Sequence, residues 1–133
     1  MKKTIEKLLH SNLKIIDISK QTGVHRVLLS RLKNGKRSID NIELSTATKL
    51  YNYQRQLEIS ENIEEVADDF FLKLTNGYSI FEYVKNKNNQ LYIYQHESNK
   101  YAKIFVLKTI SKKWLIFKNE VDYDFIKHSQ KDI

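Results

Sequence analysis

Residues 15–37, IIDISKQTGVHRVLLSRLKNGKR, constrain the fold more than any other part of the chain. Two short amphipathic stretches flank Gly23, and a positive-φ turn is about 1 kcal/mol easier for glycine than for a residue with a Cβ. Asn34 and Gly35 follow the second stretch and form a second stop signal. The segment therefore predicts a helix over residues 14–22, a tight turn, and a helix over residues 25–33.

The apolar residues of this segment predict how the two helices cross. Ser19 is small enough for the second helix to pass close to the first, and Val24 and Leu29 are placed to fill the space between them with Ile18. This is the arrangement of a helix–turn–helix, in which the second helix projects from the body of the domain toward a DNA major groove.

With the apolar side assigned, the outward positions of the second helix become candidates for reading bases. Arginine can bond guanine O6 and N7 with two hydrogen bonds, serine can bond several bases, and valine can pack on a thymine methyl group. The candidate base-reading residues are Arg26, Val27, Ser30 and Arg31.

Cationic and polar residues around the same helix are candidates for holding the phosphate backbone. They are His25, Lys33, Asn34, Lys36 and Arg37. For His25 two roles stay open, because a residue at a helix start can either cap the helix or contact a phosphate.

Charge is distributed unevenly along the chain. Residues 1–60 carry 12 Lys and Arg against 5 Asp and Glu, whereas residues 61–133 carry 11 of each. A basic half joined to a neutral half is typical of a polyanion-binding module attached to a second function.

Composition narrows the remaining chemistry. The chain has no cysteine, and its four histidines are scattered, so we expect neither disulfides nor a metal site. No signal peptide or membrane-spanning stretch is evident, and we expect a cytoplasmic protein that does not engage membranes. We find no catalytic motif and expect no enzyme activity and no cofactor.

Two further helices complete the predicted N-terminal bundle. Thr4 is a candidate cap for a first helix, and Asp40 is a candidate cap for a fourth, which continues to residue 57. Residues late in the fourth helix can form a twofold dimer seam or pack against the second domain, and both readings stay open. They are Tyr51, Tyr53, Gln54 and Leu57.

The C-terminal half changes its periodicity. Residues 61–74 have apolar residues at helical spacing, and residues 78–84, 91–96, 101–110 and 113–118 are rich in β-branched and aromatic residues. Short turns between them indicate antiparallel hairpins, and residues 122–128 predict a last strand or a helical turn. We therefore expect an all-α helix–turn–helix bundle of four helices at residues 1–60 and a small α+β domain with an antiparallel sheet at residues 61–133.

Two residue groups in the second half allow alternative interpretations. On a helix over residues 61–74, the pairs Glu64/Asp68 and Glu65/Asp69 lie one turn apart. Such carboxylates can hold Mg²⁺, act as acid and base, imitate DNA, or simply face solvent, and the last is the commonest case. The strand aromatics can stack single-stranded bases, bind a protein, or form core; we favour core plus a protein-binding surface.

The quoted segment resembles the Cro/repressor type of helix–turn–helix in its small residue at Ser19, its turn glycine, its hydrophobic plug and its closing NGKR. Residues 1–58 are also similar to the N-terminal domain shared by a group of staphylococcal anti-CRISPR proteins. The pattern departs from the family at Lys14, where a capping Ser or Thr is usual, and at Ile15, where a phosphate-binding Gln is common. The resemblance implies an autorepressor domain followed by a domain that blocks a type II CRISPR nuclease.

Together these observations predict a sequence-specific repressor of a phage or mobile element that acts on its own promoter. We expect it to bind double-stranded DNA with a palindromic operator as a homodimer. By the resemblance, residues 61–133 bind a CRISPR effector nuclease. The alternative is a plain dimeric repressor whose second domain senses a ligand or only dimerises, and a third reading is an enzyme built on the acidic helix.

Overall fold

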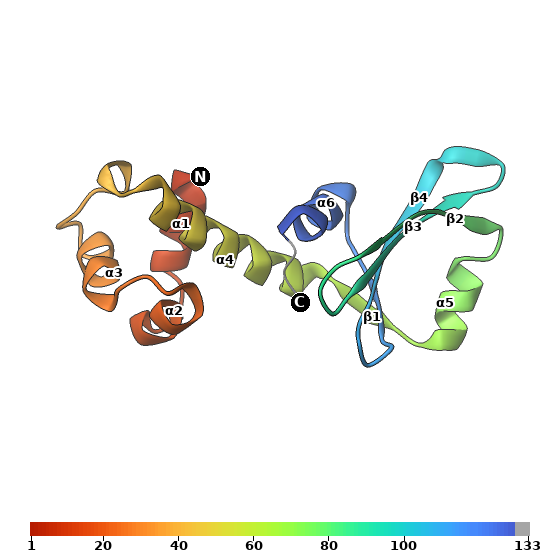
Figure 1. Cartoon of the computed structure of the whole chain (residues 1–133), viewed down its shortest axis with the longest axis horizontal. Coiled ribbons are helices and arrows are strands. Elements are labelled where there is room, and N and C mark those ends of the chain that lie inside the picture. Colours follow the sequence, from red (N-terminus) through yellow and green to blue (C-terminus); the bar gives the residue numbers. More distant parts are fainter. Residues whose placement is uncertain (130–133) are drawn as a thin grey trace. The chain divides into compact units, whose positions relative to one another are not determined.

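The computed structural model describes residues 1–129, which form two compact units divided after Glu58 (Figure 1). The first unit is helical and the second combines helices with an antiparallel sheet, so the predicted fold class is confirmed. Within the described residues, no helix combines the length and the apolar character needed to cross a bilayer.

The first unit contains four α-helices and a short 3-10 helix. They are α1 (Lys2–Leu9), α2 (Ile15–Thr22), α3 (Arg26–Lys33), the 3-10 helix Ile39–Asn41, and α4 (Leu44–Asn62), which runs on past the division between the units.

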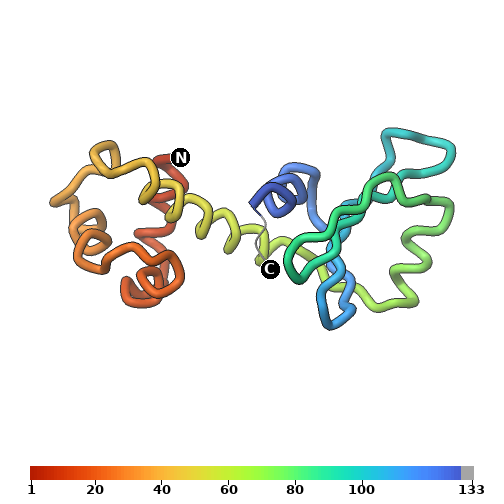
Figure 2. Tube along the Cα trace, viewed as in Figure 1, coloured from red at the N-terminus to blue at the C-terminus, as the bar shows by residue number. Residues whose placement is uncertain are grey.

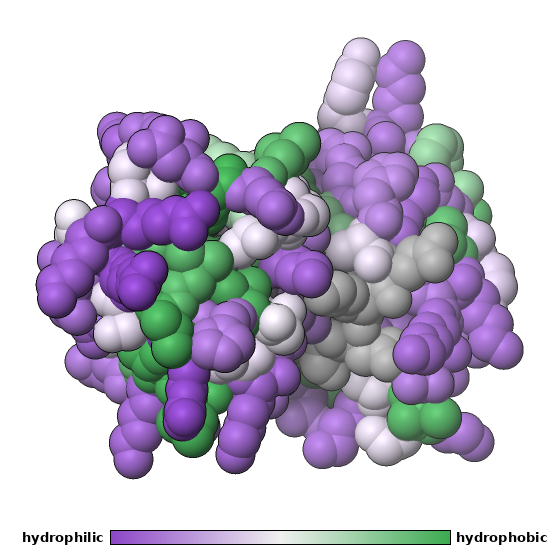
Figure 3. Space-filling model, turned by 60° about the vertical axis from the view of Figure 1, so that its left-hand side comes forward, coloured by the Kyte–Doolittle hydropathy of each residue, from purple (hydrophilic) through white to green (hydrophobic). Residues whose placement is uncertain are grey.

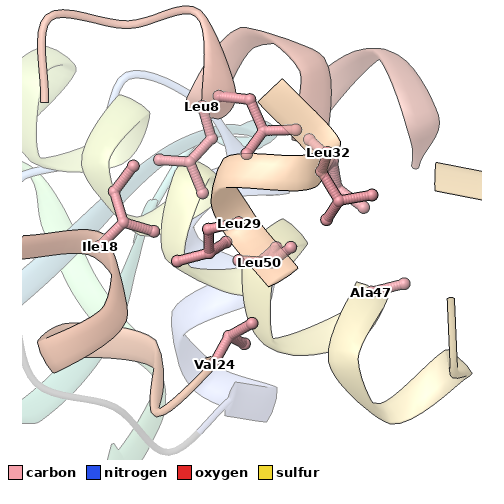
Figure 4. Close-up of a cluster of buried hydrophobic side chains, with 9 residues drawn as sticks. Leu8, Ile18, Val24, Leu29, Leu32, Ala47 and Leu50 are labelled. Atoms are coloured by element: carbon pink, nitrogen blue, oxygen red, sulfur yellow. The ribbon is translucent and has the colours of Figure 1, made fainter. Parts of the chain in front are cut away.

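One hydrophobic core holds these helices together, and Figure 4 shows its side chains converging from all four of them. Ile18, Val24 and Leu29, which the sequence places between α2 and α3, are at most 5% exposed. Leu8 and Leu50 are fully buried against them from α1 and α4. Burial of this many aliphatic side chains, each contributing about 1.5–3 kcal/mol, fixes the angle at which α3 stands on the unit.

Two predicted helix starts are wrong. Thr4 lies inside α1, which begins after Met1, so its side chain does not cap the helix. Asp40 lies in the 3-10 helix, where the Ser38 hydroxyl accepts a hydrogen bond from the Asp40 amide at 3.2 Å. That local bond favours a short turn, and the extended backbone at Ile42 delays the start of α4 to Leu44.

The second unit is built on a five-stranded antiparallel sheet with strand order β1-β5-β4-β3-β2. The elements are β1 (Glu64–Val66), α5 (Asp68–Leu74), β2 (Tyr78–Lys85), β3 (Gln90–His96), β4 (Asn99–Lys108), β5 (Trp114–Ile116) and α6 (Glu120–Ser129).

The two helices of this unit cover opposite faces of its sheet (Figure 1). Tyr123 and Ile126 of α6 pack on Leu91 and Leu107 of β3 and β4, and all four are fully buried. On the other face, Phe71 of α5 stacks on Trp114 with ring centroids 3.9 Å apart. Successive side chains of a strand point to opposite faces of the sheet, so α6 packs against one set of strand side chains and α5 against the other.

The prediction of a single helix over residues 61–74 is wrong. Helix α4 ends at Asn62, and Glu64, Glu65 and Val66 then pair with Ile116, Leu115 and Trp114 of β5. Ala67 keeps an extended backbone before α5 begins at Asp68. The acidic pairs Glu64/Asp68 and Glu65/Asp69 therefore do not share a helix face, and the strand pairing satisfies backbone groups that a helix would have satisfied locally. For residues 122–128 the structure shows the helical alternative, α6.

Candidate nucleic-acid interface

The turn between α2 and α3 positions the candidate site. Gly23 has φ of 75°, and its amide donates to the Ser19 carbonyl at 2.8 Å, which closes α2 with a left-handed residue. The Ser19 hydroxyl donates to the Val24 carbonyl at 2.6 Å, a bond that links α2 to the start of the next helix. The predicted turn glycine is confirmed, and the small residue at position 19 also acts as a hydrogen-bond donor.

His25 caps helix α3. Its Nδ1 accepts a hydrogen bond from the Val27 amide at 3.1 Å. Of the two roles that the sequence leaves open for this residue, the structure shows capping. The ring is exposed, and its other nitrogen, Nε2, takes no part in the cap. A cap of this kind satisfies one of the amides that a helix start leaves without a partner.

The four candidate base-reading residues lie on the exposed side of α3. Arg26, Val27, Ser30 and Arg31 are all exposed, and Val27 shows 48% of its surface. Leu29 and Leu32 point the other way into the core. From Arg26 to Arg31 the helix rises about 7.5 Å, which is close to two base-pair steps of about 3.4 Å each.

A Schellman motif places the cationic loop beside the end of α3. Gly35, with φ of 74°, donates to the Leu32 carbonyl at 3.3 Å, and the amide of Lys36 donates to the Arg31 carbonyl at 2.9 Å. The Arg37 amide reaches the same carbonyl at 3.2 Å, and its side chain donates to the Asn41 carbonyl at 3.5 Å. The loop cations are therefore held by backbone bonds next to the candidate base-reading positions.

The remaining candidate phosphate contacts lie at the same end of the helix. Lys33, Asn34 and Lys36 are exposed, and Asn34 donates through Nδ2 to the Ser30 hydroxyl at 3.5 Å. In Figure 3, which brings the helical unit forward, polar side chains surround a strip of apolar surface. The exposed apolar residues of this unit include Ile16, Val27 and Leu44.

The candidate dimer residues are engaged within the first unit. Tyr51, Tyr53 and Leu57 are partly buried and pack against its core, and Gln54 donates to the Glu58 carboxylate at 3.1 Å. These contacts reduce the side-chain surface that they offer to a second molecule. The sequence did not indicate them, because helical spacing alone does not distinguish a core face from a dimer face.

No cluster of three or more His, Cys, Asp or Glu side chains suited to a metal ion occurs within residues 1–129.

No model of a protein family matches the chain. It is similar to Protein Ycf2 of Physcomitrium patens, with 24% identity over 125 residues that cover 84% of this chain and 5% of that protein. The chain thus spans about a twentieth of the length of the curated relative it matches.

Proposed function

We propose that the first unit is a sequence-specific, double-stranded DNA-binding module and that the protein acts as a transcriptional repressor of its own promoter in a phage or mobile element. One observation carries the proposal. Arg26, Val27, Ser30 and Arg31 form the exposed side of a helix whose opposite side is locked into a core. A rigid helix that presents two guanidinium groups and a methyl surface suits the donor and acceptor pattern of a major groove.

Phosphate contacts would supply most of the affinity and fix the orientation. Lys33, Lys36 and Arg37 are exposed at the end of α3, and backbone bonds to Arg31 hold the loop there. Repression follows from occupancy, because a protein seated on a promoter excludes the polymerase from the same duplex.

We propose that the protein binds a palindromic operator as a homodimer, with half-sites one DNA turn, about 34 Å, apart. Footprinting would show two protected half-sites related by twofold symmetry, and sedimentation equilibrium would give twice the monomer mass. A single protected half-site bound by a monomer would contradict this part of the proposal.

A gel shift on the upstream region of the gene tests base reading. We expect Arg26→Ala and Arg31→Ala each to weaken operator binding by about 1–3 kcal/mol and to relax the preference at one base pair. Both side chains are exposed, so the fold should keep its stability. If Arg26→Ala leaves operator affinity and base preference intact, α3 does not read the groove in this register.

Lys36→Ala is the matched control for phosphate contact. We expect it to weaken operator and unrelated duplexes by similar factors, without a change of preference. The three cations at the end of α3, Lys33, Lys36 and Arg37, predict a slope of about −2.7 per subunit for the logarithm of the binding constant against the logarithm of the salt concentration. Lys36→Ala should make that slope shallower by about one per subunit.

For the second unit we propose an effector role through protein binding, and the observation that favours it is the exposure of aromatic side chains on β2 and β4. Phe81 is 58% exposed and Tyr101 is 84% exposed, and the Lys103 ammonium lies 4.7 Å from the centre of the Phe81 ring. Exposed aromatics with an adjacent cation are typical of protein-binding hot spots. The partner that the family resemblance suggests is a type II CRISPR nuclease.

The direct test mixes the full chain with a purified type II CRISPR nuclease and measures complex formation and DNA cleavage. Phe81→Ala with Tyr101→Ala should abolish complex formation and leave operator binding unchanged. If the wild-type protein neither binds nor inhibits the nuclease, the effector role is wrong. The protein is then better described by the alternative, a plain dimeric repressor whose second unit senses a ligand or only dimerises.

A further inference from the structure

One face of the second unit's sheet places lysines and aromatic rings in neighbouring cross-strand rows. The first row runs across four strands as Lys85, Gln90, Lys108 and Trp114, which are successive register partners. The Lys108 ammonium lies 4.8 Å from the centre of the Trp114 ring. This is the face that carries α5, and it is opposite to the face covered by α6.

The second row is aromatic. Tyr83 and Tyr92 are register partners with ring centroids 5.0 Å apart, and the Tyr92 ring lies 6.0 Å from that of Trp114. Each tyrosine is two residues along its strand from a member of the first row, a separation of about 6.5–7 Å. Phe71 of α5 covers Trp114, but Tyr83 at the β2 edge is 49% exposed. The Tyr83 ring therefore remains accessible beside the lysines.

A depression of about 300 Å³ lies where the lysine row meets the turns after β2 and β4, which Figure 2 shows at the same end of the sheet. Its lining includes Lys85, Lys87, Lys108 and Lys112, and none of the described residues that line it is acidic. Four cations around one shallow depression create a positive potential that favours phosphate groups.

The turn after β4 is held in a strained conformation that fixes one of these lysines. Lys112 has φ of 65°, which is uncommon for a residue other than glycine and costs about 1 kcal/mol or more. Its amide donates to the Thr109 carbonyl at 2.9 Å, and the Thr109 amide donates to the Lys113 carbonyl at 3.0 Å. These bonds maintain the strained residue at the rim of the depression.

Residues 61–133 have a net charge of zero, but their lysines and their carboxylates are not evenly mixed over the surface. Lys113 at the same turn pairs with Glu65 at 3.7 Å, and Lys127 pairs with Glu82 on the α6 face. Within residues 1–129 the four lysines of the depression have no such carboxylate partner. Their charges are consequently available to an external anion.

We propose that this face binds single-stranded nucleic acid, with backbone phosphates at Lys85, Lys87, Lys108 and Lys112 and a base stacked on Tyr83. Lysines beside open aromatic rings are the combination that single strands require, because every base has a face that can stack. A duplex keeps its base faces inside its own stack, and an acidic protein surface would use the lysines without needing the tyrosine ring.

Trp114 makes the test specific to this site, because it is the only tryptophan in the chain and lies outside the helical unit. The full-length protein is titrated at low salt with 12-nucleotide oligothymidylate in one arm and oligouridylate in another, while Trp114 fluorescence is followed. We expect a saturable change with at least one of the two, and the stronger arm identifies DNA or RNA as the preferred source.

Variants then separate stacking from charge. Tyr83→Ala should weaken binding about tenfold or more, whereas Tyr83→Phe should bind like the wild type, since the ring is what stacks. Lys85→Ala with Lys87→Ala should also weaken binding about tenfold and reduce the salt dependence. Lys100→Ala is the matched control, because Lys100 is an exposed lysine near the opposite end of β4 from Lys108, and it should have no effect.

The helix–turn–helix is controlled separately in the same protein. Arg31→Ala should leave the Trp114 response to the oligonucleotide unchanged, and Tyr83→Ala should leave duplex operator binding unchanged. If neither Trp114 fluorescence nor the fluorescence anisotropy of a labelled oligonucleotide changes on titration with either oligonucleotide, the proposal is overturned. It is also overturned by binding that the lysine variants weaken but Tyr83→Ala does not, which would indicate a general site for polyanions such as an acidic protein surface.

Discussion

Ser19 shows how one small side chain can serve two purposes where two helices cross. Its size allows α3 to approach α2, and its hydroxyl donates a short hydrogen bond to the Val24 carbonyl at the far side of the turn. An alanine would satisfy the first requirement and not the second.

We expect Ser19→Ala to lower the free energy of unfolding of the helical unit by about 1 kcal/mol, because the Val24 carbonyl loses its partner in a half-buried position. Urea unfolding followed by circular dichroism measures the change. Ser30→Ala is the matched control, since the Ser30 hydroxyl is exposed and only accepts from Asn34. An equal loss in both variants would show that the Ser19 bond contributes nothing.

At Gly23, the cost of a larger residue can be divided into backbone strain and side-chain clash. A Cβ built on Gly23 meets nothing within 4 Å, although φ is +75°. The penalty for a larger residue there comes from the backbone alone. The turn should tolerate alanine with its geometry unchanged.

We therefore expect Gly23→Ala to lower the free energy of unfolding by only about 1–2 kcal/mol and to leave the operator affinity of the folded protein unchanged. Thermal unfolding and a gel shift on the same samples test both halves of the prediction. A loss of operator affinity in a protein that is still folded would show that Gly23 does more than turn the chain.

At the scale of whole elements, an ion pair connects β2 to α6. The Tyr123 hydroxyl donates to Glu82 at 2.8 Å, and the Lys127 ammonium donates to both Glu82 carboxylate oxygens at 2.9 and 3.0 Å. Burial by itself would raise the pKa of Glu82, but the bonds from Lys127 and Tyr123 outweigh it, so this pKa is lowered from 4.5. Burial and the adjacent Glu82 raise the pKa of the Tyr123 hydroxyl, which keeps it a donor.

A lowered pKa means that Glu82 stabilises the fold above its unfolded-state value and that this contribution disappears as the pH falls through the folded-state value. At pH 7 we expect Glu82→Gln to reduce the free energy of unfolding by about 1–3 kcal/mol. The difference between variant and wild type should shrink below pH 4.5, and urea unfolding followed by Trp114 fluorescence measures it. A difference that is constant down to pH 2.5 would contradict the charge-based explanation.

Local signals predicted some elements and failed at others for a physical reason. The turns at Gly23 and Gly35 and the strands β2 to β4 depend on a few neighbouring residues, and the sequence predicts them. Residues 64–66 were predicted as helix because Ile63 and Val66 have helical spacing. Their extended conformation depends on β5, some 50 residues later, which no local pattern reveals.

The same contrast applies to the candidate site. The outward direction of Arg26 and Arg31 follows from the apolar residues beside them and could be predicted. The engagement of Tyr51 and Leu57 with the core could not, because both a dimer seam and a core face require apolar residues at the same spacing. The lysine and tyrosine rows also depend on the register between strands, which the sequence leaves undefined.

Across residues 1–129, the two units have separate hydrophobic cores made of different residues. The core around Leu29 consists of residues 5–50 with partly buried neighbours up to Leu57, whereas the second begins at Ile59 and includes Phe117 and Ile126. Helix α4 contributes to both, because Leu50 lies in the first core and Ile59 in the second. Separate cores predict that damage to one unit leaves the stability of the other unchanged.

We expect Leu29→Ala to remove about 2–5 kcal/mol from the helical unit, because the side chain is fully buried and the cavity would be lined by rigid helices. In urea, the circular dichroism transition of that unit should move to lower concentration, and the Trp114 transition should stay in place. Phe117→Ala, at a site only 4% exposed in the second core, should produce the reverse pattern. If Leu29→Ala shifted both transitions together, α4 would couple the two cores into one cooperative unit.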